Sequence, residues 1–549
     1  MATVPSPSQQ PRRPSTAALP QLVYERQPGA AARPFTLRYR RRQPEKTALY
    51  AVVRDHLETF LQEGRDATPA GGGHPPFVEH EFRRYLDCAQ LARGFARLRC
   101  PSCGEERLVA FSCKGRLCPS CWSRRAADLA ADLVDRVLPV ARYRQWVLTF
   151  PWELRYALST DRAFFSRMLG VFLRTLFAWH RYRGRRLGVP DGQTGSVSFL
   201  QRFTASLTLF PHVHALVPDG LLVPAPPGAA TFVPLPGPDR DELAGLTARI
   251  VRRLSAVARR RLAPDDADDD DAGEVGAEDD EPLVPACTAE ALRSPTHPAP
   301  RPVEAPAPRP LCIALGGFTL HAARTVEAED RVGLERLCRY GLRPPFSVER
   351  FSLAPDGRIR YELRKTTARG QTEVFFQPTA LLRRLSALLP APNTQMVRYH
   401  GLFANRSRWR PLLLRSLAPA ARSPAPVVPK PGGTEVPSGG PEPAPPPRRR
   451  RTPWAELLRR VLDVDALKCP QCATPMVVLA FLTDARVVAR ILTHLGLPTA
   501  PPPLARARDP FADASIDLDP QEPADEFTDH GRVGVLPFGS GRAPPNVDP

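Results

Sequence analysis

The chain has 549 residues, and its 76 lysines and arginines outnumber 57 aspartates and glutamates, which gives a formal net charge of +19. A chain of this length exceeds one ordinary hydrophobic core, so we expect several domains. No apolar run approaches the roughly 20 residues that cross a bilayer, and Met1–Arg42 lacks the apolar stretch of a secretory signal. Composition thus argues against membrane and secreted proteins, and the basic charge favours a polyanionic partner, nucleic acid above all.

Two features indicate long linkers. The 66 prolines are about twice the ordinary share. Asp265–Glu281 holds eleven acidic residues and no basic one, with too little apolar content to pack. We expect this acidic run to be a solvated, disordered linker. The alternative is that it imitates the charge of DNA and inhibits the protein.

Shifts in composition divide the chain into successive segments. We expect a disordered basic leader at 1–43, a cysteine-rich DNA-binding domain at 44–139, a folded domain in two parts at 140–262 and 311–417, a disordered acidic and Pro-rich insertion between them at 263–310, a linker at 418–451, a small Cys-x2-Cys segment at 452–497 and a disordered tail at 498–549.

The hydrophobic pattern predicts an α+β fold with a central antiparallel sheet. In chain order we expect a helix at Thr47–Leu61, a strand at Gln145–Phe150, a helix at Arg162–Tyr182, a hairpin of strands Gly195–Phe203 and Ser206–Val217, a strand at Gly317–His321, a helix at Glu327–Leu342, a second hairpin at Arg358–Arg364 and Glu373–Gln377, and a helix at Leu381–Leu388.

Eleven cysteines, several in short paired spacings, favour metal ligands over a disulfide framework. Cys100-x2-Cys103 and Cys118-x2-Cys121 are two such pairs, and four thiolates suit the tetrahedral preference of Zn²⁺. We therefore predict one structural zinc site from these four, with Cys113 as a further candidate and Cys88 as an additional thiol. Four basic residues surround the pairs, and we expect them to present a basic face to DNA: Lys114, Arg116, Arg124 and Arg125.

A His-x-His pattern lies on the second strand of the first predicted hairpin. Residues two apart on a strand point to the same side, so His212 and His214 project together while Val213 faces the core. Two imidazoles in this arrangement can chelate one divalent ion. Pro211 argues against a regular central strand because it cannot donate to the ladder, so we expect a bulge there.

The predicted helix before Pro344 carries a tyrosine in its last turn. Helical geometry places Tyr340 off the apolar stripe, beside Arg336 and Arg343. A phenol flanked by guanidinium groups can attack a phosphodiester whose charge those groups hold. The alternative is that Tyr340 is an amphipathic residue at the edge of the core.

Near the C-terminus, Cys469-x2-Cys472 offers two further thiolates, with His494 as a later partner. A single pair supplies only two ligands, so we expect a degenerate knuckle that packs, with a second zinc site as the alternative.

Taken in order, these motifs resemble those of the rolling-circle insertion-sequence transposases of the HUH endonuclease superfamily, specifically the IS91-like family. The resembling stretches are GFARLRCPSCG with FSCKGRLCPSCWSRR, QWVLTFPW, QRFTASLTLFPHVHALVPDG, GFTLHAA, LERLCRYGLRPPFSVERF, VRYHGLF and WAELLRRVLDVDALKCPQC. They run from about Phe82 to Leu497 and cover most of the predicted folded chain.

The resemblance implies a transposase whose two-part α+β domain is an HUH nuclease domain behind a zinc-binding domain. His212 and His214 would hold a catalytic Mg²⁺ or Mn²⁺, with Gln201 as the candidate third ligand and His321 behind it. Tyr340 would attack single-stranded DNA at transposon ends and form a 5′-phosphotyrosyl link. Such an enzyme would work in the bacterial cytoplasm, associated with the nucleoid.

Some members of the superfamily carry two tyrosines four residues apart, whereas Arg336 stands four before Tyr340, so the chain resembles the single-tyrosine branch. A second strand transfer would then need a second subunit in a homo-oligomer, or reuse of Tyr340. Tyr399 is the other tyrosine in a comparably basic motif. One alternative function is a non-catalytic zinc-dependent DNA-binding protein or decayed transposase, which has no need of His212, His214 and Tyr340 together. Another is a metal-dependent phosphodiesterase using water, which needs the histidines but not Tyr340.

Overall fold

The computed structural model describes residues 41–67, 72–225, 229–262, 310–366, 370–417, 455–457, 460 and 467–508. Most of the predicted leader, the acidic insertion, the linker at 418–451 and most of the predicted tail lie outside these residues. Among the described helices, none is long and apolar enough to span a bilayer.

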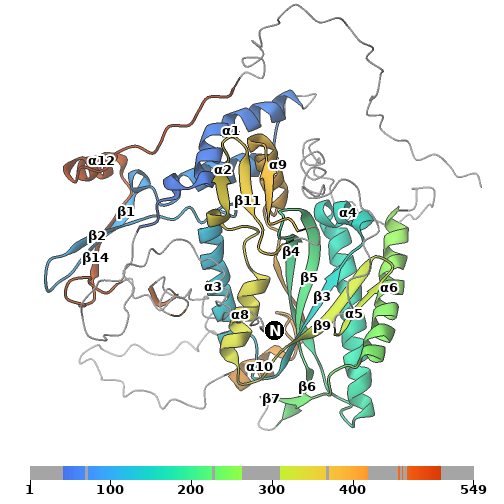
Figure 1. Cartoon of the computed structure of the whole chain (residues 1–549). Coiled ribbons are helices and arrows are strands. Elements are labelled where there is room, and N and C mark those ends of the chain that lie inside the picture. The colour runs from blue at the N-terminus through green and yellow to red at the C-terminus, as the bar shows by residue number, and fades with distance from the viewer. Residues whose placement is uncertain are drawn as a thin grey trace, which may run out of the picture. The chain divides into compact units, whose positions relative to one another are not determined.

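A six-stranded antiparallel sheet forms the centre of the described chain (Figure 1). Its order is β13-β4-β5-β3-β9-β8, so strands from both predicted parts of the folded domain contribute. The strands are β3 (Tyr143–Thr149), β4 (Gly195–Phe203), β5 (Leu209–Pro218), β8 (Cys312–Leu315), β9 (Phe318–Val326) and β13 (Val397–Gly401). The α+β class and the antiparallel sheet predicted from the hydrophobic pattern are confirmed.

Helices cover both faces of this sheet. Long helices α5 (Arg162–Arg186) and α6 (Arg240–Leu262) pack on one face, and α3 (Pro119–Arg136) and α8 (Arg331–Gly341) pack on the other (Figure 1). Strand β5 alternates between these two cores: Val213, Ala215 and Val217 face α5 and α6, while Leu216 joins the opposite core. The side chains of His212 and His214 therefore lie on the α8 side of the sheet.

The predicted hairpin of β4 and β5 is confirmed, and its irregularity explains how Pro211 is tolerated. The β4–β5 register shifts between Gln201 and Phe203, and the β3–β5 pairing ends at Thr149 and His212. Pro211 thus lies where neither neighbouring strand continues a regular ladder, so its missing N–H leaves no ladder bond broken.

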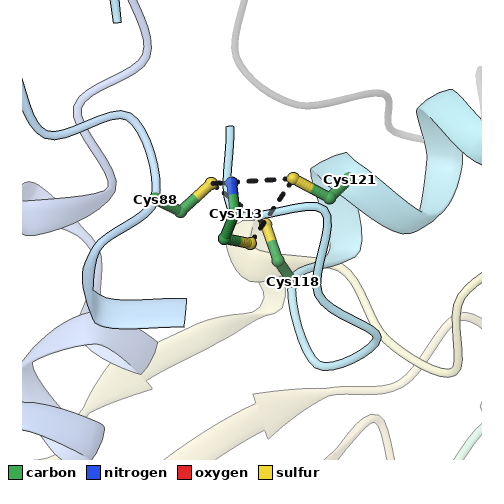
Figure 2. Close-up of side chains that lie close together, drawn as sticks. All are labelled: Cys88, Cys113, Cys118 and Cys121. Atoms are coloured by element: carbon green, nitrogen blue, oxygen red, sulfur yellow. Dashed lines mark hydrogen bonds between the residues drawn. The ribbon is translucent and has the colours of Figure 1, made fainter. Parts of the chain in front are cut away.

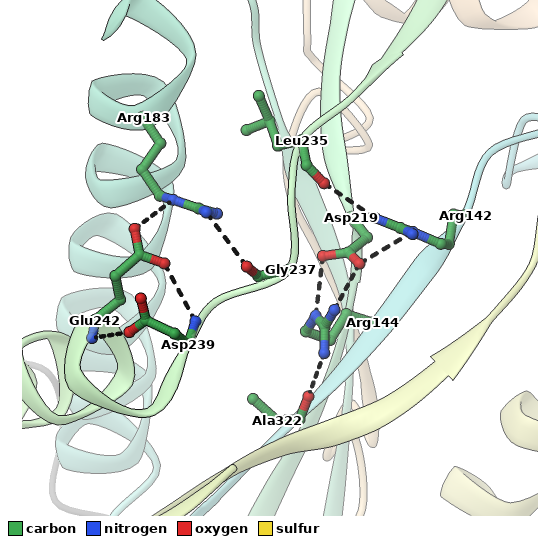
Figure 3. A network of polar contacts seen from close by, with 9 residues as sticks. All are labelled: Arg142, Arg144, Arg183, Asp219, Leu235, Gly237, Asp239, Glu242 and Ala322. Atoms are coloured by element: carbon green, nitrogen blue, oxygen red, sulfur yellow. Dashed lines mark hydrogen bonds and ion pairs between the residues drawn. The ribbon is translucent and has the colours of Figure 1, made fainter. Parts of the chain in front are cut away.

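A buried ion pair ties β3 to the end of β5. The guanidinium of Arg144 donates to both carboxylate oxygens of Asp219, at 2.9 and 2.7 Å, and Arg142 pairs with the same carboxylate at 3.1 Å (Figure 3). Nearby, Arg183 of α5 pairs with Glu242 of α6 at 3.1 Å. Removing one member of the buried pair would leave an uncompensated charge, which costs about 3–5 kcal/mol.

A second core joins the N-terminal helices to the segment that follows α8. It contains α1 (Ala48–Asp66), α2 (Pro76–Leu86), α9 (Pro378–Leu388) and the sheet β10-β11-β12, whose strands are β10 (Phe351–Leu353), β11 (Ile359–Glu362) and β12 (Glu373–Phe376). Leu117, Cys118 and Cys121, at the start of α3, belong to the same core.

A third sheet brings together two ends of the described chain. Its order is β14-β1-β2, with β1 (Phe95–Arg99), β2 (Glu106–Ala110) and β14 (Val477–Leu482), and α12 (Ala485–His494) packs on Phe95. The smaller described elements are α4 (Arg155–Thr160), the hairpin β6 (Gly220–Ala225) and β7 (Ala229–Pro234), and α10 (Arg410–Leu417). Residues 467–497 therefore pair directly with the N-terminal cysteine-rich domain.

Candidate functional site

Two neighbouring histidines on β5 form the centre of the candidate site. Both His212 and His214 are buried, and their ring centroids lie 4.9 Å apart. Burial lowers the pKa of His212 to about 4 and that of His214 well below its ordinary value, so both imidazoles are neutral near pH 7. The neutral ring is the form that binds a metal ion.

Local contacts decide which ring nitrogens are available. Nδ1 of His212 lies 2.7 Å from the carbonyl oxygen of Phe210, which fixes Nδ1 as the protonated nitrogen and leaves the Nε2 lone pair free. Both ring nitrogens of His214 are buried without a hydrogen-bond partner among the described residues. Such orphaned buried nitrogens need a ligand to offset their desolvation.

Gln201 lies on β4 directly opposite His212 in the strand register. Its Nε2 donates to the backbone carbonyls of Tyr340 and Gly341, at 2.8 and 3.1 Å, and these bonds fix the orientation of the amide. Its Oε1 is buried and has no partner among the described residues. A free carbonyl oxygen and two free imidazole nitrogens on one side of the sheet make a suitable donor set for Mg²⁺ or Mn²⁺.

Tyr340 meets the histidines from the last turn of α8. Its ring centroid lies 5.7 Å from that of His214, with the rings nearly perpendicular at 83°. Unlike the histidines, Tyr340 is 46% exposed, so a ligand can reach its hydroxyl from solvent. The side chains of His214 and Tyr340, which are distant in the sequence, therefore meet between the sheet and α8, and the Gln201 side chain contacts the backbone of the same helical turn.

Of the two arginines expected beside Tyr340, Arg343 lies over its ring. The guanidinium carbon is 4.7 Å from the ring centroid and also 5.2 Å from the ring of Phe203. Arg336 is exposed on α8, on the turn before the tyrosine. Arg343 therefore keeps a positive charge beside the phenol.

His321 is the second-ranked candidate for a third ligand, and it is two strands away. It lies on β9 opposite Val147 of β3, which in turn lies opposite His214. Among the described residues, no three of the His, Cys, Asp and Glu side chains around this site bring their donor atoms within 4.8 Å of one another. Gln201 borders His212 directly in the strand register, whereas strand β3 lies between His321 and the two histidines.

The first cysteine cluster joins three separate segments (Figure 2). Cys88 follows α2, Cys113 follows β2, and Cys118 and Cys121 begin α3. The sulfur–sulfur distances are 3.5–3.7 Å, close to the edge of about 3.8 Å for a tetrahedron with Zn–S bonds of about 2.3 Å. The guanidinium of Arg42 donates to the Cys88 sulfur at 3.3 Å, which offsets part of the thiolate charge.

A second cluster contains Cys100, Cys103, Cys469 and Cys472. The sulfur–sulfur distances between the two pairs are 3.4, 3.5 and 3.6 Å, which again fit a tetrahedral four-thiolate site. In each of the two clusters, all four sulfurs lie within 4.8 Å of one another.

Two expectations about the cysteines are thus corrected. Cys100 and Cys103 do not share a site with Cys118 and Cys121, because the first pair lies on the β1–β2 hairpin and the second at the start of α3. Cys113 does belong with the second pair, and Cys88 completes that set. The C-terminal pair is not a degenerate knuckle that merely packs, since it supplies half of a four-cysteine cluster.

The four basic residues expected to face DNA differ in their surroundings. Lys114, Arg124 and Arg125 are exposed. Arg116 is half-buried, and its guanidinium donates to the carbonyls of Pro390 and Ala391 at 2.8 and 2.7 Å, so it links the cysteine loop to the end of α9.

Sequence reasoning missed the role of Trp122, which lies one residue after Cys121. Its indole N–H donates to the carbonyl of Leu342 at 2.7 Å and so attaches α3 to the end of the tyrosine helix. A tryptophan beside an N-terminal cysteine knuckle carries no signal for a partner 220 residues away.

Comparison with known proteins identifies two matching families, in the order of the domains. Residues 52–150 match a family described as "Transposase zinc-binding domain" of the IS91 type, and residues 195–410 match the Y2-type family described as "Putative transposase". The second match includes Gln201, both histidines and Tyr340, while Cys469 and Cys472 lie outside both.

A curated protein described as "Putative transposase y4qJ", from Sinorhizobium fredii (strain NBRC 101917 / NGR234), is 28% identical to the chain over 137 residues. The match covers 24% of this chain, and the chain spans about a third of the relative, 32% of its length. No solved structure matches the chain. The two family matches, the cysteine clusters and the mixed α+β fold agree: the chain carries an N-terminal zinc-binding domain of the IS91 transposase type, followed by a Y2-type transposase domain.

Proposed function

We propose that this transposase nicks and rejoins single-stranded DNA at the ends of its element through a 5′-phosphotyrosyl intermediate, with Tyr340 as the nucleophile. The observation that carries the proposal is the contact between the rings of Tyr340 and His214, 5.7 Å apart between centroids, although 125 residues of sequence lie between them. Packing alone gives no reason for an exposed phenol to lie beside two buried, neutral imidazoles with free nitrogens.

The covalent step conserves the energy of the broken bond. The phenolic oxygen of Tyr340 loses its proton to solvent and attacks the scissile phosphorus, so an O–P bond forms while the bond from phosphorus to the 3′-oxygen breaks. The leaving 3′-oxygen takes up a proton and becomes a 3′-hydroxyl. Rejoining reverses these steps, because a 3′-hydroxyl attacks the phosphotyrosine and releases the phenol.

His212, His214 and Gln201 would hold a divalent cation such as Mg²⁺ or Mn²⁺, which when bound supplies positive charge to the scissile phosphate. The chain itself provides the orientation. The bond from Nδ1 to the Phe210 carbonyl holds the His212 ring, and the Gln201 amide links the histidine side of the sheet to the tyrosine helix. Arg343, over the tyrosine ring, can pair with a phosphate oxygen during attack.

The DNA partner follows from the chemistry of the site and the charge of the chain. A half-exposed phenol can reach a phosphodiester in an unpaired strand, and the basic residues near the first cysteine cluster can contact phosphates on either side. A homo-oligomer would supply a second Tyr340, since α8 contains one tyrosine.

The proposal is tested with labelled single-stranded oligonucleotides tiled across the DNA that flanks the gene, incubated with protein and Mg²⁺ or Mn²⁺. We expect a protein–DNA adduct that survives denaturing electrophoresis and is absent with Tyr340→Phe. Tyr399→Phe is the matched control, since it removes a phenol from β13 but leaves α8 intact, and it should form the adduct as the unchanged protein does.

The variants separate the competing functions. His212→Ala and His214→Ala should each reduce adduct formation by at least 100-fold while DNA binding remains. Cleavage that continues without an adduct would show hydrolysis by water, and binding without cleavage of any oligonucleotide would leave a non-catalytic DNA-binding protein. An adduct that persists in Tyr340→Phe and disappears in Tyr399→Phe would assign the reaction to the other tyrosine.

A further inference from the structure

Each of the two cysteine pairs in the second cluster forms a turn, and the two turns have the same pattern of backbone hydrogen bonds. In the first, the amide of Cys100 donates to the carbonyl of Glu105 at 2.8 Å and the amide of Gly104 donates to that of Cys100 at 3.1 Å. In the second, Cys469 pairs with Thr474 at 2.9 Å and Ala473 with Cys469 at 3.0 Å. The sequences Cys-Pro-Ser-Cys-Gly and Cys-Pro-Gln-Cys-Ala thus form matched turns from opposite ends of the described chain.

These turns direct backbone N–H groups at the sulfurs. The amides of Gln471 and Cys472 donate to the Cys469 sulfur, that of Thr474 to Cys472 and that of Glu105 to Cys103. Amide donors of this kind stabilise thiolates, and thiolates are the form that binds zinc. The sulfurs lie 3.4–3.6 Å apart, far beyond the length of about 2.05 Å for a disulfide bond.

The surrounding structure brings the two turns together. Strand β14 pairs antiparallel with β1 from Phe95–Leu482 to Arg99–Val477, and Val488 and Leu492 of α12 pack on Phe95. The apolar core behind the cysteines is small: among the described residues it contains Ala96, Leu98, Cys100, Cys469 and Met476, with three partly buried neighbours. A core of this size supplies little stability by itself, so a metal ion is the main candidate for holding the turns in place.

We propose that Cys100, Cys103, Cys469 and Cys472 bind a second Zn²⁺ that attaches residues 467–497 to the β1–β2 hairpin. We call this ion and its four ligands the clasp. The ion would close a loop of more than 360 residues. This loop includes the whole Y2-type transposase domain, residues 195–410. Because Cys103 and Cys472 are exposed while three of the four cysteines in the first cluster are buried, a chelator removes the clasp zinc first.

The metal content of the purified full-length protein tests the site. We expect two zinc ions per chain and release in two phases when a chelator is added, the faster phase from the clasp. In Cys469→Ser/Cys472→Ser we expect one zinc per chain and loss of the fast phase. Cys312→Ser, outside both clusters, is the matched control and should retain both. One zinc per chain in the unchanged protein, or two in the double variant, would overturn the proposal.

A cleavage experiment tests the clasp itself. A specific protease site is inserted after Gly440 in the full-length protein, and the nicked chain is examined by size-exclusion chromatography. We expect both fragments to elute together in the unchanged protein and in Cys312→Ser, and to separate in Cys469→Ser/Cys472→Ser. Fragments that stay together in the double variant would show that strand pairing suffices without zinc. Neither readout depends on DNA cleavage, so failure here leaves the proposed function untouched.

Discussion

At the scale of single residues, one alanine occupies a position that favours glycine. Ala473 has a φ of 62°, and the equivalent residue of the matched turn is Gly104, with a φ of 76°. The left-handed region costs a residue with a Cβ about 1–2 kcal/mol, whereas glycine adopts it freely. The C-terminal knuckle therefore carries backbone strain that its N-terminal counterpart lacks.

Two single substitutions, one at each of these positions, test that strain. Ala473→Gly should stabilise the cluster by about 0.5–1 kcal/mol, because the relief of strain exceeds the entropy that glycine adds to the unfolded chain. The measurement is the chelator concentration that removes the more accessible zinc, which should rise. Gly104→Ala should lower this concentration, since an added Cβ would meet only the Arg99 guanidinium at 4.0 Å, an ordinary contact that leaves the backbone as the source of cost. No change in either variant would show that the turns carry no strain.

A buried histidine of α5, the helix on the other face of the sheet from His212 and His214, makes stability depend on pH. His180 of α5 packs against the rings of Trp146 and Trp179, and neither of its nitrogens has a partner among the described residues. Burial lowers the pKa of His180 to about 3. As pH falls below about 6.5, His180 becomes protonated in the unfolded chain but stays neutral in the folded chain. The free energy of unfolding therefore decreases on acidification.

His180→Leu removes this proton uptake. Between pH 7 and pH 5 the unchanged protein should lose about 2 kcal/mol more stability than the variant, as the difference between the two pKa values requires. Urea midpoints of both proteins at the two pH values measure it. His494→Leu, which changes an exposed histidine of α12, should leave the pH dependence as it is. An equal pH dependence in His180→Leu would contradict the assignment.

At the scale of elements, side chains from two directions cap the end of α8. Gln201 of β4 donates to the carbonyls of Tyr340 and Gly341, and Trp122 of α3 donates to the next carbonyl, that of Leu342. The last carbonyls of a helix lack partners within the helix, so these bonds replace water and fix the final turn. The position of the phenol therefore depends on the sheet and on the helix that begins at the first cysteine cluster.

Gln201→Leu and Trp122→Phe separate positioning from metal binding. Both remove a donor to α8, so both should slow adduct formation, Gln201→Leu by about 10–100-fold. Gln201→Leu alone should also raise the Mn²⁺ concentration needed for half-maximal cleavage, because it alone removes a candidate ligand. Gln377→Ala, which changes an exposed glutamine before α9, serves as the control. An unchanged Mn²⁺ requirement in Gln201→Leu would restrict Gln201 to positioning.

Local pattern predicted the elements of the transposase domain better than those of the zinc-binding domain. The β4–β5 hairpin and the long helix α5 follow from alternation and helical periodicity over many residues. The hairpin β1–β2 was missed because its five-residue strands are short and charged, and β14 completes its sheet from far along the chain. The spacing of the cysteines also led to a wrong grouping, because Cys118-x2-Cys121 and Cys100-x2-Cys103 are alike in sequence. In the structure the first pair begins a helix, whereas the second forms a turn closed by Gly104.

At the scale of the whole chain, long-range pairing assembles every candidate site. The histidines lie on β5, before residues 263–309 in the sequence, and Tyr340 lies on α8, after them; those residues are outside the described part of the chain. In the central sheet, β3 lies between β5 and β9 and so joins the parts of the chain that precede and follow them. The sequence could predict that His212 and His214 share a face, because that follows from the period of a strand. It could not show that Gln201 contacts α8, since that contact depends on how the helix packs on the sheet.

The central claim is that the Tyr340 phenol forms a covalent bond with DNA beside the two histidines. Mass spectrometry of the trapped adduct after nuclease and trypsin digestion tests it most directly. We predict a nucleotide phosphate attached to the peptide Tyr340–Arg350, whose internal Arg343 is followed by proline and resists trypsin. A nucleotide on any other peptide, or DNA cleaved efficiently with no modified peptide, would contradict the account.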